Sequence, residues 1–333
     1  MRAAFKKGRD VELREMVLRP VGMHEVRLKV DACGVCGTDL HVNPSGGDEA
    51  AGFGHEVAGT VLEVGDGVPH LQPGQRIVLD SATPCGRCDH CRNARQELCS
   101  DIQSFWFTNS FGFADEMIAP AVCAIPCEDL SPDVACLQEP LGVAIDLVRL
   151  ADITSTSNVL VLGAGPIGLM ALALVRRLGA RRVFVSEFGR ATARCDLARC
   201  FGADMVIDPT CTPLTEAAFG CDIDRILVTT PPPTLPDAFA VACKGAIVAF
   251  IGIAYGDNAF CRFDANAFHF KKLQLRASFA SPALYGPLAL QYLRENVVDG
   301  NALVSHRFSL AEIDQALTTA RTDPDAIKVV VQP

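Results

Sequence analysis

The chain has 333 residues, of which 49% are hydrophobic and 21% charged, and its formal net charge is -9 at pH 7. This length exceeds that of a typical single core, so we expect two compact domains and no long disordered region. The negative charge argues against nucleic acid or an anionic membrane as the main partner. The first residues show no secretory signal, and no apolar run reaches the roughly 18 residues that span a bilayer, so a cytoplasmic protein is predicted.

The first 150 residues predict a β-rich domain. Apolar runs at 25–35 and 56–65 are separated by stretches rich in glycine and proline, a pattern typical of strands joined by turns. From residue 158 onward, apolar strands alternate with helical segments, which indicates βαβ units and a parallel sheet. Further strands are expected at 224–230, 245–253 and 272–279, followed by a helix over 281–300 and a strand–helix–strand tail.

Fifteen cysteines occur in the chain. Without a secretory signal they are expected to be reduced, so clustered cysteines are tested first as metal ligands. A thioredoxin-like redox pair would need two cysteines at a helix start and would leave the other two of a cluster of four unexplained. Closed zinc sites take four thiolates, and short spacings let one loop wrap around the ion. We therefore predict a structural zinc at the C-x2-C-x2-C-x7-C run of Cys85, Cys88, Cys91 and Cys99.

The stretch VLVLGAGPIG places a G-x-G-x-x-G run where a predicted strand ends and a helix begins. Such glycines permit the tight turn, let a pyrophosphate approach the backbone, and allow close packing of helix and strand. Glu187 ends the next strand, where a carboxylate binds the adenosine ribose hydroxyls and favours NAD, whereas Arg190 could accept the 2′-phosphate of NADP. The predicted cofactor-binding residues are Gly163, Gly165, Pro166, Ile167, Gly168, Glu187 and Arg190.

A closed four-cysteine site leaves no position for a substrate, so a catalytic metal has to lie elsewhere. Three short stretches hold the candidates: CGVCGTDLH, GHEVAG and LQEPLGVA. Together they supply one thiolate, one imidazole and one or two carboxylates, which is enough for an open zinc site. The candidates are Cys36, Thr38, Asp39, His41, His55, Glu56 and Glu139.

These motifs, in this order, resemble the zinc-dependent medium-chain alcohol dehydrogenases. Glu139 stands where the classical primary-alcohol enzymes carry cysteine, which is similar to the sorbitol and polyol dehydrogenase branch. The match runs from GVCGTDLH to the closing KVVVQP. The resemblance implies an α/β protein with a GroES-like β-rich catalytic domain (1–150 and 290–333) and a Rossmann NAD-binding domain (151–289) with a doubly wound parallel sheet.

The resemblance also implies roles and partners. It predicts hydride transfer between NAD(H) and a secondary alcohol or ketone of a polyol, cyclitol or sugar-like substrate, in a homodimer or homotetramer with two zinc ions per chain. Asp39 is expected to orient a histidine ligand. The implied assignments are Cys36, His55 and Glu139 as catalytic-zinc ligands, Glu56 as an alternative ligand, and Thr38 and His41 as a proton relay.

Two alternatives remain open at this point: a threonine-dehydrogenase-like or simple secondary-alcohol enzyme, and a non-catalytic NAD-binding relative. Three features depart from the family pattern: a short loop after His41, an aromatic run containing Trp106 and Phe107, and Ala280 where polyol dehydrogenases often carry a basic residue. The aromatic side chains are expected either to line the substrate cleft or to form a small cluster under a loop. The alanine at position 280 argues against a simple sugar alcohol. A cyclic or modified polyol, or an aminocyclitol-type intermediate, is therefore an open hypothesis.

Overall fold

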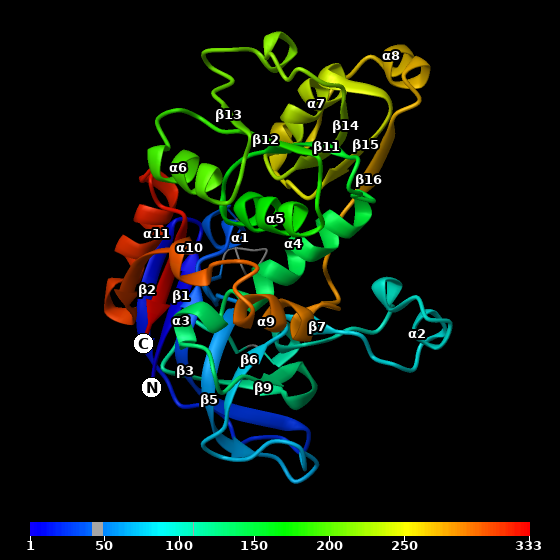
Figure 1. The fold of residues 1–333 in the computed structure, drawn as a ribbon. Helices are drawn as coiled ribbons and strands as arrows, with labels where there is room; N and C mark the ends of the chain where they lie inside the picture. The colour runs from blue at the N-terminus through cyan, green and yellow to red at the C-terminus, as the bar shows by residue number, and fades with distance from the viewer. Residues whose placement is uncertain (42–48, 109) are drawn as a thin grey trace. The chain divides into compact units, whose positions relative to one another are not determined.

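A computed structural model describes residues 1–41, 49–108 and 110–333. The chain forms two compact units, one of residues 1–142 with 280–333 and the other of residues 143–279 (Figure 1). None of the helices in the described ranges is long and apolar enough to cross a membrane. Each unit has its own sheet system, and helix α4 (Gln138–Leu150) carries the chain from the first unit into the second.

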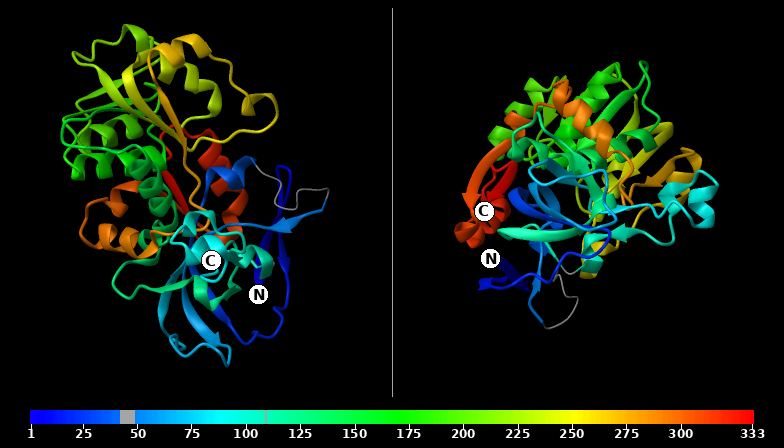
Figure 2. Two further views of the ribbon diagram at one scale, coloured as in Figure 1. Left: turned by 90° about the vertical axis from the view of Figure 1, so that its right-hand side faces the viewer. Right: turned by 90° about the horizontal axis from the view of Figure 1, so that it is seen from below.

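The first unit is built on a seven-stranded sheet of order β10-β6-β5-β3-β18-β17, with β9 added on β3. The C-terminal strand β18 pairs antiparallel with β3, with Val330 opposite Gly34, so the last residues of the chain return to the sheet of the N-terminal part (Figure 2). Alternate residues of β3, namely Val26, Leu28 and Val30, are fully buried, as expected for a strand with one face on the core. The strands are β3 (Glu25–Gly34), β5 (Glu56–Val64), β6 (Arg76–Leu79), β9 (Glu116–Pro120), β10 (Ala124–Pro126), β17 (Val304–Ser309) and β18 (Lys328–Gln332).

Smaller elements complete this unit. A three-stranded sheet has the order β2-β1-β4, and β7 pairs with β8. These strands are β1 (Arg2–Lys7), β2 (Asp10–Glu15), β4 (Ala51–Gly52), β7 (Ala82–Thr83) and β8 (Gln103–Ser104). The helices are α1 (Gly37–His41), α2 (Asp89–Arg92), α3 (Pro132–Ala135), α9 (Gly286–Arg294), α10 (Gly300–Leu303) and α11 (Ile313–Thr322).

The second unit contains a six-stranded, all-parallel sheet of order β13-β12-β11-β14-β15-β16. Taken in chain order this is 3-2-1-4-5-6, the strand order of a Rossmann fold. Val159, Leu160 and Val161 of β11 are all fully buried, as in a strand covered on both faces. The elements are β11 (Asn158–Leu162), α5 (Pro166–Arg177), β12 (Arg182–Ser186), α6 (Thr192–Cys200), β13 (Met205–Ile207), β14 (Ile223–Val228), α7 (Leu235–Val241), β15 (Ala242–Phe250), α8 (Ala265–Phe270) and β16 (Gln274–Ala277).

The predicted α/β fold class is confirmed, with a β-rich unit and a Rossmann sheet. The helix predicted over 281–300 is shorter than expected. It is α9, which ends at Arg294. Asn296 has a φ of 52°, and a left-handed residue of this kind closes a helix. The chain then starts the short helix α10 at Gly300.

Candidate metal and cofactor sites

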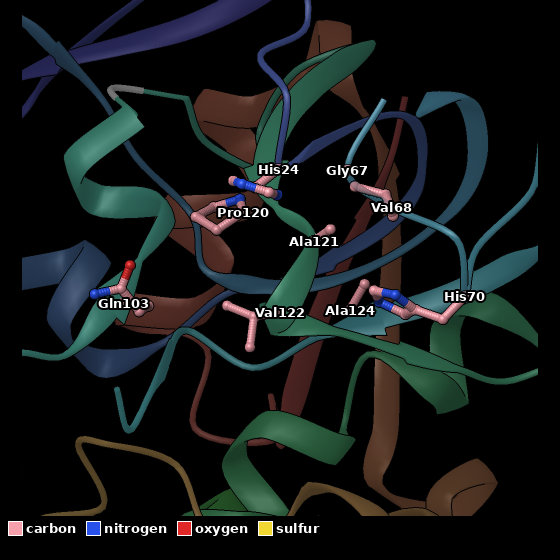
Figure 3. Close-up of a pocket in the computed structure, with 9 residues that line it drawn as sticks. All are labelled: His24, Gly67, Val68, His70, Gln103, Pro120, Ala121, Val122 and Ala124. Atoms are coloured by element: carbon pink, nitrogen blue, oxygen red, sulfur yellow. The ribbon is translucent and has the colours of Figure 1, made fainter. Parts of the chain in front are cut away.

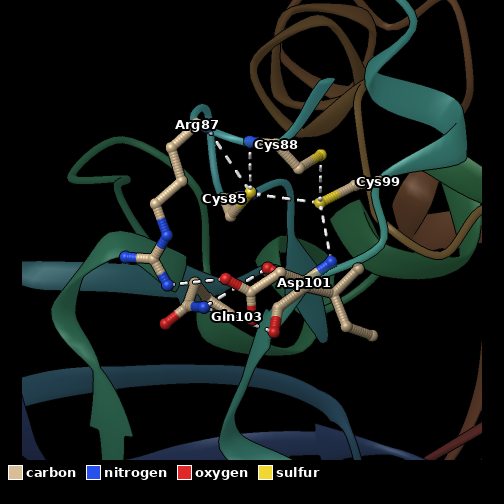
Figure 4. Close-up of polar contacts among 7 residues, drawn as sticks. Cys85, Arg87, Cys88, Cys99, Asp101 and Gln103 are labelled. Carbon is tan, nitrogen blue, oxygen red and sulfur yellow. Dashed lines mark hydrogen bonds and ion pairs between the residues drawn. The ribbon is translucent and has the colours of Figure 1, made fainter. Parts of the chain in front are cut away.

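Four cysteines gather in the loop that joins β7 to β8. The sulfur atoms of Cys85, Cys88, Cys91 and Cys99 all lie within 4.8 Å of one another, and those of Cys88 and Cys99 are 3.9 Å apart (Figure 4). Zinc–sulfur bonds of about 2.3 Å place tetrahedral sulfur ligands about 3.8 Å apart, so the cluster fits one zinc ion. The four thiolates would leave that ion no open position.

Backbone amides point at the sulfur atoms of this knuckle. The Cys85 amide donates to Cys99 Sγ and the Cys88 amide to Cys85 Sγ, each at 3.3 Å. Hydrogen bonds from the backbone of Cys91 and Ser100 lower the pKa of the Cys88 thiol. Donors of this kind stabilise the thiolate form, which is the form that binds a metal. The loop is therefore arranged for metal binding by its backbone as well as by its side chains.

A second cluster lies where β3 ends and β5 begins. The ligand atoms of Cys36, His55 and Glu56 lie within 4.8 Å of one another. Cys36 follows β3, Glu56 opens β5, and the two strands pair with Gly34 opposite Glu56. The sheet register itself therefore brings the thiol beside the imidazole. One thiolate, one imidazole and a carboxylate are a donor set that suits a catalytic zinc with an open position.

Glu139 lies beside this second cluster at the start of α4. Its Oε1 accepts a hydrogen bond of 3.0 Å from the Ser81 hydroxyl, and its carboxylate is close enough to interact electrostatically with His55. The neighbouring Gln138 instead donates to Asp80 at 2.7 Å, and burial raises the pKa of Asp80 to about 6. The site thus offers two carboxylates, one inside the compact cluster and one beside it held by a serine.

Asp39 lies beside two members of this cluster, Cys36 and His55. Its carboxylate accepts the Cys36 amide at 2.9 Å, and its other oxygen lies 3.7 Å from His55 Nδ1. Burial alone would lower the pKa of His55, but the charges of Cys36 and Asp39 hold it well above its ordinary value. At 3.7 Å the contact between Asp39 and His55 is a charge contact without a hydrogen bond, and Nδ1 has no hydrogen-bond partner among the described residues. A carboxylate that faces one ring nitrogen in this way is suited to orienting a histidine ligand.

Helix α1 carries the two predicted relay residues. Thr38 is half-buried and His41 is exposed, and their spacing of three residues places them on one face of the helix. The helix is tied to β1 by Lys6, whose ammonium donates to the Asp39 carbonyl oxygen. Lys6 is only 1% exposed, so this contact is made in the interior. The position of Thr38 therefore depends in part on a buried lysine that no sequence motif marks.

A second buried lysine supports the other side of the cluster. Lys328, at the start of β18, is 2% exposed, and its ammonium donates to Glu56 at 2.6 Å and to the Val35 carbonyl at 3.0 Å. Glu56 is itself 1% exposed. Sequence reasoning missed this ion pair, which joins residues 272 positions apart. The available signal was a lysine opening an otherwise apolar strand, KVVVQ.

Trp106 packs against His55 of the second cluster. Its ring centroid is 5.5 Å from that of His55 and 5.4 Å from that of Phe111. The indole remains 42% exposed, so it presents an apolar face beside a candidate ligand. The side chain of Phe107 and residues 42–48 of the short loop lie outside the described residues. Ala280 is half-buried in the first unit.

The glycine-rich turn between β11 and α5 meets the requirements of a dinucleotide site. Gly163 has a φ of 94°, which favours glycine. A Cβ at Gly168 would collide with the Gly163 carbonyl, whereas a Cβ at Gly165 would meet no atom within 4 Å. That open space lies at the N-terminus of α5, where Pro166 and Ile167 begin the helix. A pyrophosphate group fits such a position.

Glu187 follows β12 and joins this turn. One of its carboxylate oxygens accepts the Ala164 amide and the other accepts the Phe188 amide, each at 2.8 Å. The Arg190 guanidinium lies over the Phe188 ring, 5.1 Å from its centroid. The predicted ribose-binding carboxylate is therefore fixed at the edge of the glycine turn, and the arginine packs on a neighbouring aromatic ring.

A surface hollow of about 380 Å³ also occurs in the first unit. His24, His70 and Gln103 contribute to its wall, with the two histidines on different segments (Figure 3). None of the residues that line it belongs to the predicted sites. We assign it no role.

Comparison with known proteins decides the family. Residues 22–129 match the alcohol dehydrogenase GroES-like domain, and residues 166–291 match the zinc-binding dehydrogenase domain. The chain belongs to the zinc-dependent medium-chain alcohol dehydrogenases. The resemblance inferred from the motifs is thereby confirmed, as is the expectation of an oxidoreductase that acts on alcohols.

Two curated relatives and one solved structure illustrate the likeness. The chain is 29% identical to a sorbitol dehydrogenase of Arabidopsis thaliana over 340 residues, which is 96% of this chain and 92% of the relative. It is 38% identical to an L-threonine 3-dehydrogenase of Pyrococcus horikoshii over 212 residues, 61% of this chain and 60% of the relative. A short chain alcohol dehydrogenase from E. coli CFT073, complexed with NADH, matches with a TM-score of 0.89 and 25% identity, covering 100% of this chain and 99% of that one.

Proposed function

We propose that this dehydrogenase oxidises a secondary alcohol of a polyol, cyclitol or sugar-like substrate to the ketone, reversibly, with NAD as the hydride acceptor. The observation that carries the proposal is the cluster of Cys36, His55 and Glu56 with Glu139 beside it. The same chain carries a glycine turn and a fixed acidic residue suited to a dinucleotide. A non-catalytic relative would have no use for this metal-binding donor set.

Two zinc ions per chain are proposed, a structural ion at the four-cysteine knuckle and a catalytic ion at the second cluster. Cys36, His55 and Glu139 are the proposed catalytic ligands, and Glu56 is the alternative to Glu139. Bound zinc supplies a Lewis acid that acidifies the alcohol, while NAD takes the hydride. On this proposal the first unit holds both metal ions and the second unit binds the cofactor.

Oxidation of the alcohol releases a hydride to the nicotinamide and a proton that has to reach water. Thr38 is proposed to accept the hydroxyl proton and His41 to release it to water, because an imidazole can both accept and donate a proton. The half-buried threonine and the exposed histidine on one helix face support this direction of transfer. Asp39 acts as a positioning residue that fixes His55.

NAD is proposed over NADP on the strength of Glu187. A carboxylate at this place binds the 2′- and 3′-hydroxyls of the ribose and repels a 2′-phosphate. Arg190 is the residue that would favour NADP, but its guanidinium packs over Phe188. The cofactor contacts proposed for the turn are made by Gly163, Gly165, Pro166, Ile167 and Gly168.

Trp106 bears on the class of substrate. Its exposed indole beside His55 offers an apolar face against which the carbon–hydrogen face of a sugar-like or cyclitol ring can pack. A threonine-dehydrogenase activity is the second candidate, favoured by the 38% identity to an L-threonine 3-dehydrogenase over part of the chain. The two candidates differ in whether the substrate carries an amino acid group.

A substrate panel tests this proposal. Purified enzyme is assayed with polyols, cyclitols, secondary alcohols and L-threonine, each with NAD and with NADP, by the absorbance of the reduced cofactor. We expect the largest kcat/KM with a polyol or cyclitol and NAD. A larger value for L-threonine establishes the second candidate, and larger values with NADP contradict the assignment of Glu187.

A homodimer or homotetramer in the cytoplasm is also proposed. Strand β16 lies at the edge of the Rossmann sheet, and the exposed apolar residues Leu275 and Phe279 lie on or next to it. Such an edge is a template for pairing with a second copy. Light scattering is expected to give the mass of a dimer or tetramer, and a monomer at micromolar concentration contradicts this expectation.

The cytoplasmic location is proposed because the fifteen free cysteines suit a reducing compartment.

A further inference from the structure

Besides Glu187, a second carboxylate, that of Asp208, contacts the loop that follows β12. Asp208 comes immediately after β13, and β13 pairs parallel with β12 with Ile207 opposite Ser186. Asp208 therefore lies beside Glu187 at the same edge of the sheet. Its Oδ2 accepts a hydrogen bond of 2.9 Å from the Gly189 amide, so Asp208 contacts the loop that begins with Glu187.

The Asp208 carboxylate is held firmly and is charged. Its Oδ1 accepts the Thr210 amide at 2.9 Å and the Thr210 hydroxyl at 2.6 Å. These hydrogen bonds from Thr210, together with that from Gly189, lower the pKa of Asp208 to about 2. A Cβ at position 189 would lie 2.6 Å from Asp208 Oδ2, so the close approach depends on glycine. Asp208 is thus a fixed negative charge at neutral pH.

Two backbone amides of the loop are already occupied, and its cationic donor, the Arg190 guanidinium, packs over the Phe188 ring. The Phe188 amide donates to Glu187 and the Gly189 amide donates to Asp208. Backbone amides of a turn are common donors to phosphate groups. A 2′-phosphate on the adenosine ribose would meet two carboxylates here, with two of the loop's amides already occupied, whereas a 2′-hydroxyl can donate to Glu187.

We propose that Asp208 is a cofactor-specificity residue, which excludes the 2′-phosphate of NADP both by its charge and by occupying the Gly189 amide. The inference rests on the proposed use of NAD and adds a second determinant to Glu187. Asp208 acts through its charge and through the loop that it holds, without a contact to the cofactor, so it is a positioning residue for the ribose pocket. Its effect is expected in the affinity for NADPH far more than in the affinity for NADH.

Binding titrations with NADH and NADPH test the proposal without an alcohol substrate. The fluorescence of the reduced nicotinamide is followed with wild-type enzyme and with the Asp208→Asn variant, which keeps a side-chain oxygen but loses the charge. The ratio of Kd for NADPH to Kd for NADH is expected to fall by about tenfold in the variant, which corresponds to about 1.4 kcal/mol. Most of the change should be tighter binding of NADPH.

Asp204→Asn is the matched control. Asp204 precedes β13, accepts the Val183 amide at 2.7 Å and pairs with Arg176 at 2.6 Å. Its replacement removes one negative charge, together with that ion pair, at the opposite end of the strand. Its Kd ratio is expected to match that of wild type. An equal fall in both variants means a general charge effect and overturns the proposal, as does a ratio in Asp208→Asn within threefold of wild type.

The outcomes separate this inference from the proposed function. Wild-type enzyme that binds NADPH as tightly as NADH contradicts the choice of NAD, whatever the variants do. Wild-type preference for NADH that Asp208→Asn leaves unchanged overturns the role of Asp208 alone. Asp208→Ser, which also removes the charge and keeps an oxygen atom, is measured in parallel, and its Kd ratio is expected to fall in the same way if the asparagine variant does not fold.

Discussion

The Cys36→Ser variant is expected to lose at least about 10³-fold in kcat/KM, equivalent to about 4 kcal/mol of transition-state stabilisation. Serine retains the size of the side chain but replaces a thiolate by a neutral hydroxyl, which is a poor zinc ligand. With one anionic sulfur fewer, His55 and the neighbouring carboxylates are expected to release the ion. Without bound zinc the alcohol keeps its ordinary, high pKa. The proposed relay residue Thr38 is too weak a base to remove the hydroxyl proton from such an alcohol.

Zinc content and cofactor binding locate the defect of this variant. Elemental analysis is expected to give two zinc ions in wild type and one in Cys36→Ser, with the knuckle still filled. The affinity for NADH should be unchanged, since the glycine turn and Glu187 lie in the other unit. Cys200→Ser, which replaces an exposed cysteine on α6, is the control and should retain full activity and both ions. Full turnover by Cys36→Ser would refute the assignment of the catalytic site.

The Rossmann sheet and the knuckle were predictable because their signals are local. Strand β11, the glycine turn and helix α5 follow one another within 20 residues, and each has a periodicity or a residue type that only one structure explains. The knuckle is equally local, since one loop supplies all four sulfur atoms. Such local patterns can be interpreted without knowing which distant strands pair with one another.

The candidate metal cluster of Cys36, His55 and Glu56 was less predictable because it depends on pairing between distant segments. Cys36 and His55 are brought together by the register of β3 with β5. Glu139 was a candidate from the residues, but its assignment as the third ligand came from the family resemblance. The buried cation Lys6 gave no local signal, because a lysine in a strand is usually exposed. Lys328 gave only a weak one, since it opens an otherwise apolar strand. Their contacts exist only once β1 and β18 join the fold of the first unit.

Replacing Lys328 by methionine is expected to destabilise the first unit by about 3–5 kcal/mol. The substitution removes the ammonium that pairs with Glu56 and leaves that carboxylate buried without this counter-charge. It also removes the donor to the Val35 carbonyl, next to the candidate ligand Cys36. Urea unfolding followed by tryptophan fluorescence measures the loss selectively, because the chain has one tryptophan, Trp106, which lies in this unit.

Two further variants separate the buried charge from the loss of a side chain. Glu56→Gln combined with Lys328→Met removes both charges, so we expect the double variant to be more stable than Lys328→Met alone, because no unpaired carboxylate remains buried. Lys29→Met is the surface control: Lys29 pairs with Asp31 at 3.0 Å but its side chain is 60% exposed, so the change should stay within about 0.5 kcal/mol. A double variant less stable than Lys328→Met would show that Glu56 stabilises the unit without its lysine, as expected if bound zinc supplies the compensating positive charge.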